Sequence, residues 1–388
     1  MTAPVPSDVE AAPVTAPAPA EAPAEIDFPL GWMLENAAAP LQYRSVTEVV
    51  QLPVADAAKF SQLPYAYPPA LSLALRQMPD GTWGESMLTL PSGRGDPFQG
   101  VGTTHAVRRL REYGWERESP PLVLARRPLF RLLAADEDPA FLFELAGKSG
   151  GAGTAKLDIE TIRYGRGLLR EAAASALARM GYERDPRLRG AATRMLERVD
   201  AFLRLPNADK PFVRVGNKHV LPAEAAPPSI YYLDTLAHMP LFRSEHYDAM
   251  ERLLVYLSQP TPRQEAAVLV GKRIVKEPHL VLGDALPHRT AADADLPWTL
   301  AWLELMARLE FLSRNDGWAK LFERLLDDRD ALGVWRMPRR TVKMRSSNPY
   351  VWALFPLQDE QTGEARFADV TFRLGLIARL SGRPIRAI

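Results

Sequence analysis

Apolar residues recur at helical spacing in paired segments along this chain, and a short break separates the two segments of each pair. In three pairs the break contains Gly114, Gly181 or Pro240, and a second amphipathic segment follows it. Such a pattern is typical of helical hairpins, because apolar residues at positions i, i+3, i+4 and i+7 share one helix face and Gly or Pro ends the helix. The pattern therefore predicts a series of helical hairpins.

Two more hairpins and a last helix extend the series. One hairpin joins residues 309–314 to 318–322, and an earlier, less regular one turns at Pro53. The last helix is predicted over 371–380 and ends before Gly382. The hairpins repeat at a loose period of about 60–70 residues, and helical repeats of this size either close into a ring or stack into an open, HEAT-like solenoid.

The segment Gln77-Met78-Pro79-Asp80-Gly81-Thr82-Trp83 carries the pattern Gln-x3-Gly-x-Trp, and Ala331-Leu332-Gly333-Val334-Trp335 is a degenerate copy near the other end. The pattern resembles the QW motif of the terpenoid cyclase and protein prenyltransferase superfamily, whose fold is an α/α toroid. The resemblance implies that Gln77, Gly81 and Trp83, and in the second copy Gly333 and Trp335, tie one helical hairpin to the next.

Two features favour a closed ring over an open stack. The Gly-x-Trp turns recur near both ends of the chain, and the last predicted helix is apolar on more than one side, unlike the polar cap of a solenoid. We therefore expect an all-α fold, an α/α toroid of about five to six helical hairpins. The open solenoid remains the alternative.

The beginning of the chain departs from this pattern. Residues 1–26 are rich in Ala and Pro and contain no Lys or Arg, so they have neither the basic start nor the apolar run of a secretory signal. Such a composition buries too little apolar surface to offset the entropy of ordering. We expect a disordered tail over 1–26, either a solubilising leader or a tether that docks a partner, and a single toroid domain over 27–388.

Composition narrows the class of protein. Of the 388 residues, 47% are hydrophobic and 24% are charged, which is typical of a globular protein with a sizeable core. The net charge of +1 provides no field that would draw nucleic acid or anionic lipid, and no stretch approaches the roughly 20 apolar residues of a membrane span. The chain has no cysteine, which excludes disulfides. We expect a cytoplasmic protein with no membrane span and no nucleic-acid partner.

Catalytic acids in the resembled superfamily follow known patterns. Class II cyclases protonate an alkene with Asp-x-Asp-Asp, class I cyclases hold magnesium with Asp-Asp-x-x-Asp, and the prenyltransferases hold zinc with Asp, Cys and His. The nearest match here is Asp293-Ala294-Asp295, which stands just before Leu296 and Pro297. Asp293 and Asp295 are thus the candidates for a catalytic acid, although Asp before Pro at a helix start is more typical of a helix N-cap.

The six histidines do not form a pattern of metal ligands. No two of them stand four residues apart, as two ligands on one helix face would, and thiolate ligands are absent. The chain also lacks a P-loop, a dinucleotide fingerprint and a Gly-x-Ser-x-Gly elbow. We expect no metal site and no cofactor.

Several aromatic residues are candidates for a central cavity, where aromatic faces would stabilise a carbocation. Aromatic residues at helical spacing are also typical of an ordinary core, and both interpretations stay open. The candidates are Trp298, Trp302, Trp318, Trp352, Tyr231 and Tyr232.

A basic cluster follows the second Gly-x-Trp turn, within a long connection of little periodicity over residues 336–366. Five cations close together can bind a phosphate or diphosphate group, and they can equally form a patch for an acidic partner or a solvated loop. The cluster contains Arg336, Arg339, Arg340, Lys343 and Arg345. Another Ala/Pro-rich connection runs from Pro222 to Pro228, and connections of this length are often functional.

Three functions are compatible with these observations. The resemblance implies a terpenoid-cyclase-like toroid protein that binds an apolar ligand, such as an isoprenoid, in a central cavity, without evident catalysis. The first alternative is a non-catalytic protein that docks partners on the toroid surface. The second is an (α/α)6 carbohydrate-active enzyme, for which Glu144 and Asp158 are the candidate pair of loop carboxylates. A deep apolar pocket would favour the ligand-binding protein, and a filled centre would favour the docking protein.

Overall fold

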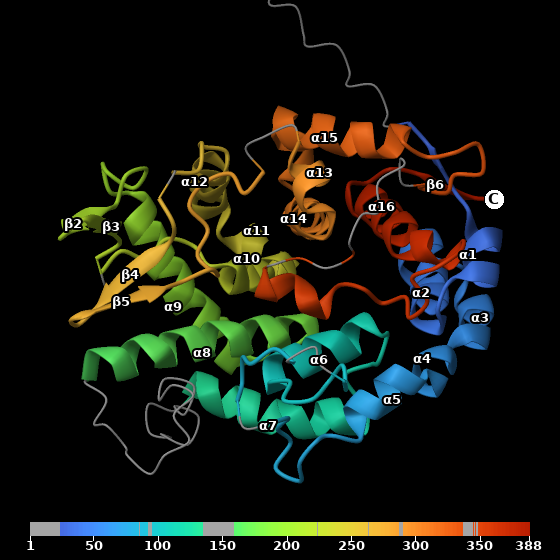
Figure 1. Ribbon diagram of the computed structural model, residues 1–388, viewed down its shortest axis with the longest axis horizontal. Helices are drawn as coiled ribbons and strands as arrows, with labels where there is room; N and C mark the ends of the chain where they lie inside the picture. The colour runs from blue at the N-terminus through green and yellow to red at the C-terminus, as the bar shows by residue number, and fades with distance from the viewer. Residues whose placement is uncertain are drawn as a thin grey trace, which may run out of the picture.

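The computed structural model describes residues 24–84, 86–91, 95–134, 159–222, 224–262, 264–286, 290–336, 344, 346 and 348–388. Most of the regular structure in these ranges is helical, which confirms the all-α class (Figure 1). No helix in the described ranges has the length and apolar character that crossing a membrane requires.

Six segments have buried residues along half or more of their length, and we call them the central helices. They are α2 (Ala39–Arg44) with the π-helix η1 (Ser45–Val50), α6 (Thr103–Glu112), α8 (Ile159–Arg179), α10 (Ile230–Ala237), α14 (Leu296–Arg308) and α16 (Ala368–Leu380). In α10, for example, every residue from Ile230 to Ala237 is buried. A helix that is buried all round belongs to the interior of a fold, with other helices on its outer side.

The central helices contact one another in a cycle. Helix α8 packs on both α6 and α10, α14 packs on α10 and α16, and α16 packs on η1. Between α2 and α6 the connection is the side chain of Arg44, which is hydrogen-bonded to Glu112. The last central helix of the chain therefore contacts the first.

The remaining helices are shorter or amphipathic, and several of them lie at the outer edge of the molecule in Figure 1. They are α1 (Leu30–Asn36), α3 (Val54–Ala57), α4 (Leu63–Ala66), α5 (Pro68–Ala74), α7 (Pro120–Ala134), α9 (Pro186–Leu203), α11 (Pro240–Glu245), α12 (Tyr247–Leu257), α13 (Ala291–Ala294) and α15 (Asp316–Asp327), with the 3₁₀ turns η2 (Ala58–Phe60), η4 (Leu312–Arg314), η5 (Pro349–Ala353) and η6 (Ala365–Phe367). Helix α15 buries one face only, through Trp318 and four apolar residues after it. These helices supply the second members of the predicted hairpins.

Two antiparallel hairpins stand beside the helices. They are β2 (Val213–Val215) with β3 (Lys218–Val220), and β4 (Ala267–Val270) with β5 (Arg273–Lys276). Their glycines Gly216 and Gly271 have positive φ, as two-residue hairpin turns require. The sequence analysis did not predict these strands.

The two ends of the described chain meet in a short parallel ribbon. Strand β1 (Ile26–Phe28) pairs with β6 (Ile385–Ala387), with Ile26 opposite Ile385 and Phe28 opposite Ala387. The ribbon begins inside the segment that we had expected to be a disordered tail over 1–26, since Ile26 is paired and buried. Residues 1–23 of that tail lie outside the described part of the chain.

The Gln77–Trp83 segment is a tight turn that packs against helix α7. Its turn closes with a hydrogen bond from Met78 N to Thr82 O (2.8 Å), and the indole of Trp83 is fully buried. The side chain of Gln77 donates to Pro121 O at the start of α7. Gly81 has φ of +91°, and a Cβ there would lie 2.5 Å from a carbonyl oxygen of α7, so only glycine fits.

The second Gly-x-Trp segment closes with the same backbone hydrogen bond as the first, but it packs against strand β1. Asp330 N donates to Val334 O (2.9 Å), as Met78 does in the first turn. Trp335 N donates to a threonine hydroxyl on α16 as Trp83 N does to one on α6. Here, however, the neighbour is β1: Arg329 donates to Asp27 O, and Gly333 lies against the same carbonyl. The second Gly-x-Trp turn thus contacts β1, although the two are far apart in the sequence.

Candidate functional site

The centre of the molecule holds a cluster of buried charges, to which each central helix contributes one. We call this cluster the charge layer; it consists of Arg44, Glu112, Arg179, Asp234, Glu304 and Arg373. Every member is less than 10% exposed. Charges survive such burial only when they are paired and hydrogen-bonded.

Glu112 is the hub of the charge layer. Its carboxylate accepts from Arg44 Nη1 (2.5 Å), Arg179 Nη1 (2.7 Å) and Arg373 Nη2 (2.5 Å). Arg373 also donates to Glu304 (2.5 Å). Arg179 continues the network, because its other nitrogens reach Asp234 (2.8 Å).

These ion pairs keep the three carboxylates ionised. Burial alone would raise the pKa of Glu112, but Arg373, Arg44 and Arg179 outweigh burial and hold that pKa well below its usual range. For Glu304, burial is likewise outweighed, by Arg373 first, and the pKa falls to about 2. The pKa of Asp234 is lowered against burial by Arg179 and, to a smaller extent, by His238. The charge layer is therefore a fixed set of charges near neutral pH rather than a proton donor of the cyclase type.

The segment around η5 covers the charge layer on one side. Tyr350 donates its hydroxyl hydrogen to Asp234 Oδ1 (2.9 Å), and Arg179 donates to the same hydroxyl oxygen (3.1 Å). Further along, the backbone nitrogens of Leu357 and Gln358 donate to the Asp369 carboxylate near the start of α16. Tyr350 thus covers Arg179 and Asp234 of the charge layer. The C-terminal parts of η1, α14 and α16 border a hollow of about 590 Å³.

Asp293 and Asp295 lie at the start of α14, away from the charge layer. Asp295 is its N-cap and accepts from Trp298 N (3.0 Å), while its second oxygen accepts from Ser346 Oγ (2.6 Å). Asp293 belongs to the short helix α13 and its side chain is 69% exposed. The geometry of Asp295 is that of a cap, because the carboxylate is engaged by a backbone N–H of the first turn.

Only one residue of the predicted basic cluster lies within the described chain. Arg336 donates to Asp330 and Glu364, so its charge is already paired. Arg339, Arg340, Lys343 and Arg345 lie outside the described residues. Glu144 and Asp158, the carboxylate pair of the carbohydrate hypothesis, also lie outside them.

The candidate aromatic residues are divided between several places. Trp298, Trp302 and Trp318 contact one another between α14 and α15, and Trp302 and Trp318 are fully buried. Trp352 lies over His105 of α6, and Tyr231 lies against His279. Tyr232 is buried as well. These contacts are those of a core, and they do not gather the six rings around one cavity.

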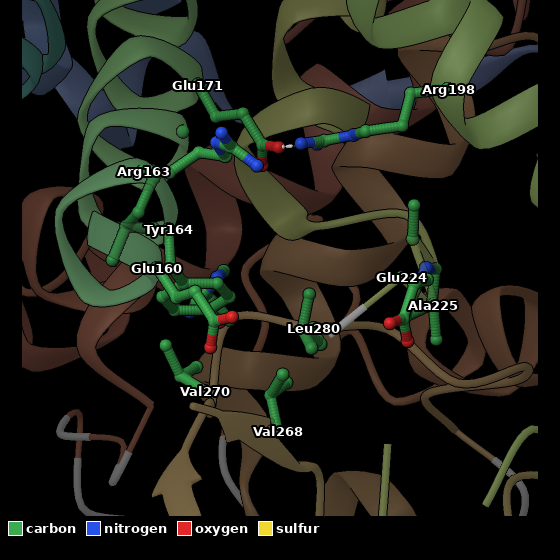
Figure 2. Close-up of a pocket in the computed structure, with 15 residues that line it drawn as sticks. Glu160, Arg163, Tyr164, Glu171, Arg198, Glu224, Ala225, Val268, Val270 and Leu280 are labelled. Atoms are coloured by element: carbon green, nitrogen blue, oxygen red, sulfur yellow. Dashed lines mark hydrogen bonds and ion pairs between the residues drawn. The ribbon is translucent and has the colours of Figure 1, made fainter. Parts of the chain in front are cut away.

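A cleft of about 450 Å³ opens beside α8, and residues of α9, β4 and the 224–227 connection complete its walls (Figure 2). One wall is apolar and consists of Val268 and Val270 of β4 with Leu280 and Ala225. Gly167 of α8 leaves room beside it, since a Cβ there would meet only the end of Arg198 at 3.9 Å. The cleft combines an apolar wall with a few polar groups, as small-molecule sites do.

One buried carboxylate, Glu171, lines the cleft, and a second, Glu277, contacts the cleft residues His279 and Tyr164. Glu171 accepts from Arg198 and from the hydroxyl of Ser229. Glu277 pairs with His279 Nδ1 at 2.8 Å. Burial, followed by the charge and hydrogen bond of Glu277, raises the pKa of Tyr164 on the cleft wall, so Tyr164 stays protonated.

The rim of the cleft carries three further charged side chains. They are Glu160 and Arg163 on the first turns of α8 and Glu224 on the opposite connection (Figure 2). Within the described part of the chain, none of the three has an ion-pair partner. The rim therefore presents one cation and two anions that are available to a ligand.

Comparisons of the chain with protein-family models, curated proteins and solved structures found no match. In the described ranges, no group of three or more His, Asp or Glu residues has the arrangement of a metal site.

Neither the charge layer nor the cleft was predicted from the sequence. The charge layer left a signal: Arg44, Glu112 and Arg179 are 68 and 67 residues apart, and Glu304 and Arg373 are 69 apart, close to the hairpin period. A charge that recurs once per repeat inside an apolar segment points inward. For the cleft the signal was the Pro222–Pro228 connection, whose residues line it.

Proposed function

We propose that this chain is an α/α toroid of the terpenoid-cyclase-like kind that has no cyclase chemistry and works as a ligand-binding protein. The cycle of contacts among the central helices supports the toroid, as does the matching geometry of the two Gly-x-Trp turns. The ion-paired charge layer beneath η5 argues against a central apolar chamber at that level. Its carboxylates are ionised, whereas a cyclase acid must be protonated.

The binding site of this proposal is the cleft beside α8. The observation that carries it is the pairing of an apolar wall, Val268 and Val270, with the unpartnered rim charges Glu160, Arg163 and Glu224. A ligand that satisfies all of these has an apolar body, an ammonium group for the glutamates and a carboxylate for the arginine. An amino acid with an apolar side chain, or a short peptide, has this chemistry. An isoprenoid diphosphate fits less well, because Glu160 and Glu224 would repel its charges.

Three matched probes test this ligand class. Leucine has all the required groups, isopentylamine lacks the carboxylate, and 4-methylpentanoate lacks the amine. We expect leucine or a leucyl peptide to raise the Tm and to titrate in calorimetry, and both truncated probes to bind at least tenfold more weakly. Geranyl diphosphate serves as the probe for the isoprenoid hypothesis. Its binding in place of leucine would refute the amino-acid class.

A variant that fills the cleft locates the site. Gly167→Leu places a side chain in the cleft without backbone strain, and replacing a helical Gly gains up to about 1 kcal/mol of helix propensity. The variant should be at least as stable as the wild type and should lose ligand binding. Gly190→Leu on α9 is the matched control, since its Cβ has similar room outside the cleft. Unchanged binding by Gly167→Leu would show that the cleft is not the site.

A second candidate function is the docking of an extended partner peptide along α12. Three adjoining hollows of about 400, 470 and 660 Å³ follow this helix and share lining residues. Tyr247, Val255 and Leu205 stand along them with half or more of their surface exposed, although they are large apolar or aromatic residues. The groove shares α9 with the cleft but none of its lining residues, so Gly167→Leu would leave it intact.

A further inference from the structure

Arg108 of α6 is a buried cation without a hydrogen-bond partner. Its side chain is fully buried, and within the described part of the chain no acceptor lies within hydrogen-bond distance of any of its three nitrogens. The ring of Tyr350 covers the face of its guanidinium, at 4.0 Å from the ring centroid. Stacking of this kind uses the face of the group and leaves the N–H bonds in its plane free.

The neighbouring carboxylates are already engaged. Asp234, whose pKa Arg108 helps to lower, accepts from Arg179, Ser175 and Tyr350. Glu112 is occupied by three other arginines. Arg108 itself takes part in none of the ion pairs of the centre within the described part of the chain. Its charge is therefore left without a paired carboxylate, and an uncompensated buried charge is costly.

A second unsatisfied group stands on the same side of the helix. The hydroxyl of Thr104 is buried and has no partner within the described residues. Thr104, Arg108 and Glu112 follow one another at intervals of four residues, so their side chains share one face of α6. This face is the one turned to the charge layer and to η5, which packs on α6. A guanidinium fork and a hydroxyl, both without a partner within the described residues, thus stand one helical turn apart on the same face of α6.

We propose that Arg108 and Thr104 form a binding site for one oxyanion, a carboxylate or a phosphate group. The anion would accept two in-plane hydrogen bonds from the guanidinium and one from the hydroxyl, and it would compensate the charge of Arg108. A buried water molecule would satisfy the hydrogen bonds but would leave that charge uncompensated. This site is separate from the cleft beside α8 and does not depend on the function proposed for it.

The test is the anion dependence of thermal unfolding, at constant pH and ionic strength. Protein dialysed into chloride is titrated with inorganic phosphate, acetate and octanoate. We expect the Tm of the wild type to rise by about 3 °C or more and to saturate. An equal response to acetate and octanoate identifies a site for a free anion, and a response to octanoate alone identifies a site for the acidic head of a larger ligand. No saturable response to any of the three would overturn the proposal.

Substitutions assign the response to the two residues. Arg108→Met removes the charge and keeps most of the volume, so it should abolish the response, and in chloride it should unfold at or above the wild-type Tm. Thr104→Val should weaken the apparent anion affinity several-fold. If Arg108→Met does not fold, this variant alone tests whether the response arises at the proposed site. Arg336→Met, at a surface ion pair, should keep the full response. An undiminished response in both Arg108→Met and Thr104→Val would refute the assignment.

Discussion

Replacing Glu112 by Gln removes the negative charge on which three buried arginines converge. The side chain keeps its volume, so the change leaves no cavity and tests the charge alone. Breaking a buried ion pair by removing one partner costs about 3–5 kcal/mol, because the other charge stays buried without compensation. Here the amide nitrogen of Gln would also point a donor at guanidinium groups that are donors themselves. We therefore expect a loss of about 3–5 kcal/mol in the free energy of unfolding, a large share of the usual 5–15 kcal/mol.

Urea denaturation measures this loss as a shift of the midpoint at an unchanged m-value. Glu251→Gln is the matched control, since Glu251 pairs with Arg314 on the surface, where solvent screens the charges. Its cost should stay below about 1 kcal/mol. A loss below about 1 kcal/mol for Glu112→Gln as well would refute the idea that the charge layer stabilises the fold.

The pH dependence gives an independent check with a definite sign. The pKa of Glu112 is lowered in the folded protein, so its contribution to stability is fully present above the unfolded-state pKa of about 4.3. That contribution is lost as the pH falls through the lower, folded-state pKa. The difference in stability between wild type and Glu112→Gln should therefore be constant above about pH 5 and shrink below about pH 4. A difference that grows on acidification would contradict the ion pairing.

Two further predictions concern the turns and the cap. Trp83→Ala should cost about 3–5 kcal/mol, because the buried indole also donates to Leu73 O (2.8 Å); an unchanged Tm would show that the Gln77–Trp83 turn does not hold α5 and α7 together. Asp295→Asn should be nearly neutral in thermal unfolding and Asp295→Ala should cost about 1 kcal/mol, as for an N-cap. Cyclisation of an isoprenoid diphosphate or a linear triterpene that disappears in Asp295→Asn would instead make this carboxyl catalytic.

The helices were predictable because their signals are local. Gly114 and Gly181 both have positive φ and stand where α6 and α8 end, so a glycine after an apolar periodic segment marked the turns correctly. The β4–β5 hairpin was missed for the opposite reason. Its two strands are only four residues long, and short apolar runs do not separate strand from helix by periodicity.

The chemistry of the centre was not predictable from single residues. In the sequence, Glu112 stands between Arg111 and Tyr113 and gives no sign of its burial. Its partners Arg44, Arg179 and Arg373 are brought to it by three other helices, and only their common spacing along the chain connects them. The cleft combines α8, α9 and β4 in the same way, so its charges could be assembled only after the helices were placed in space.

The ribbon between β1 and β6 has a mechanical consequence. The two strands are parallel, so the free end of β1, at Ile26, and the free end of β6, at Ala387, lie at opposite ends of the ribbon. A force that pulls on both ends of the chain would load its hydrogen bonds together, in shear, instead of opening them one by one. The seam between the first and last elements would thus resist tension as a clamp, although it is only three residues long.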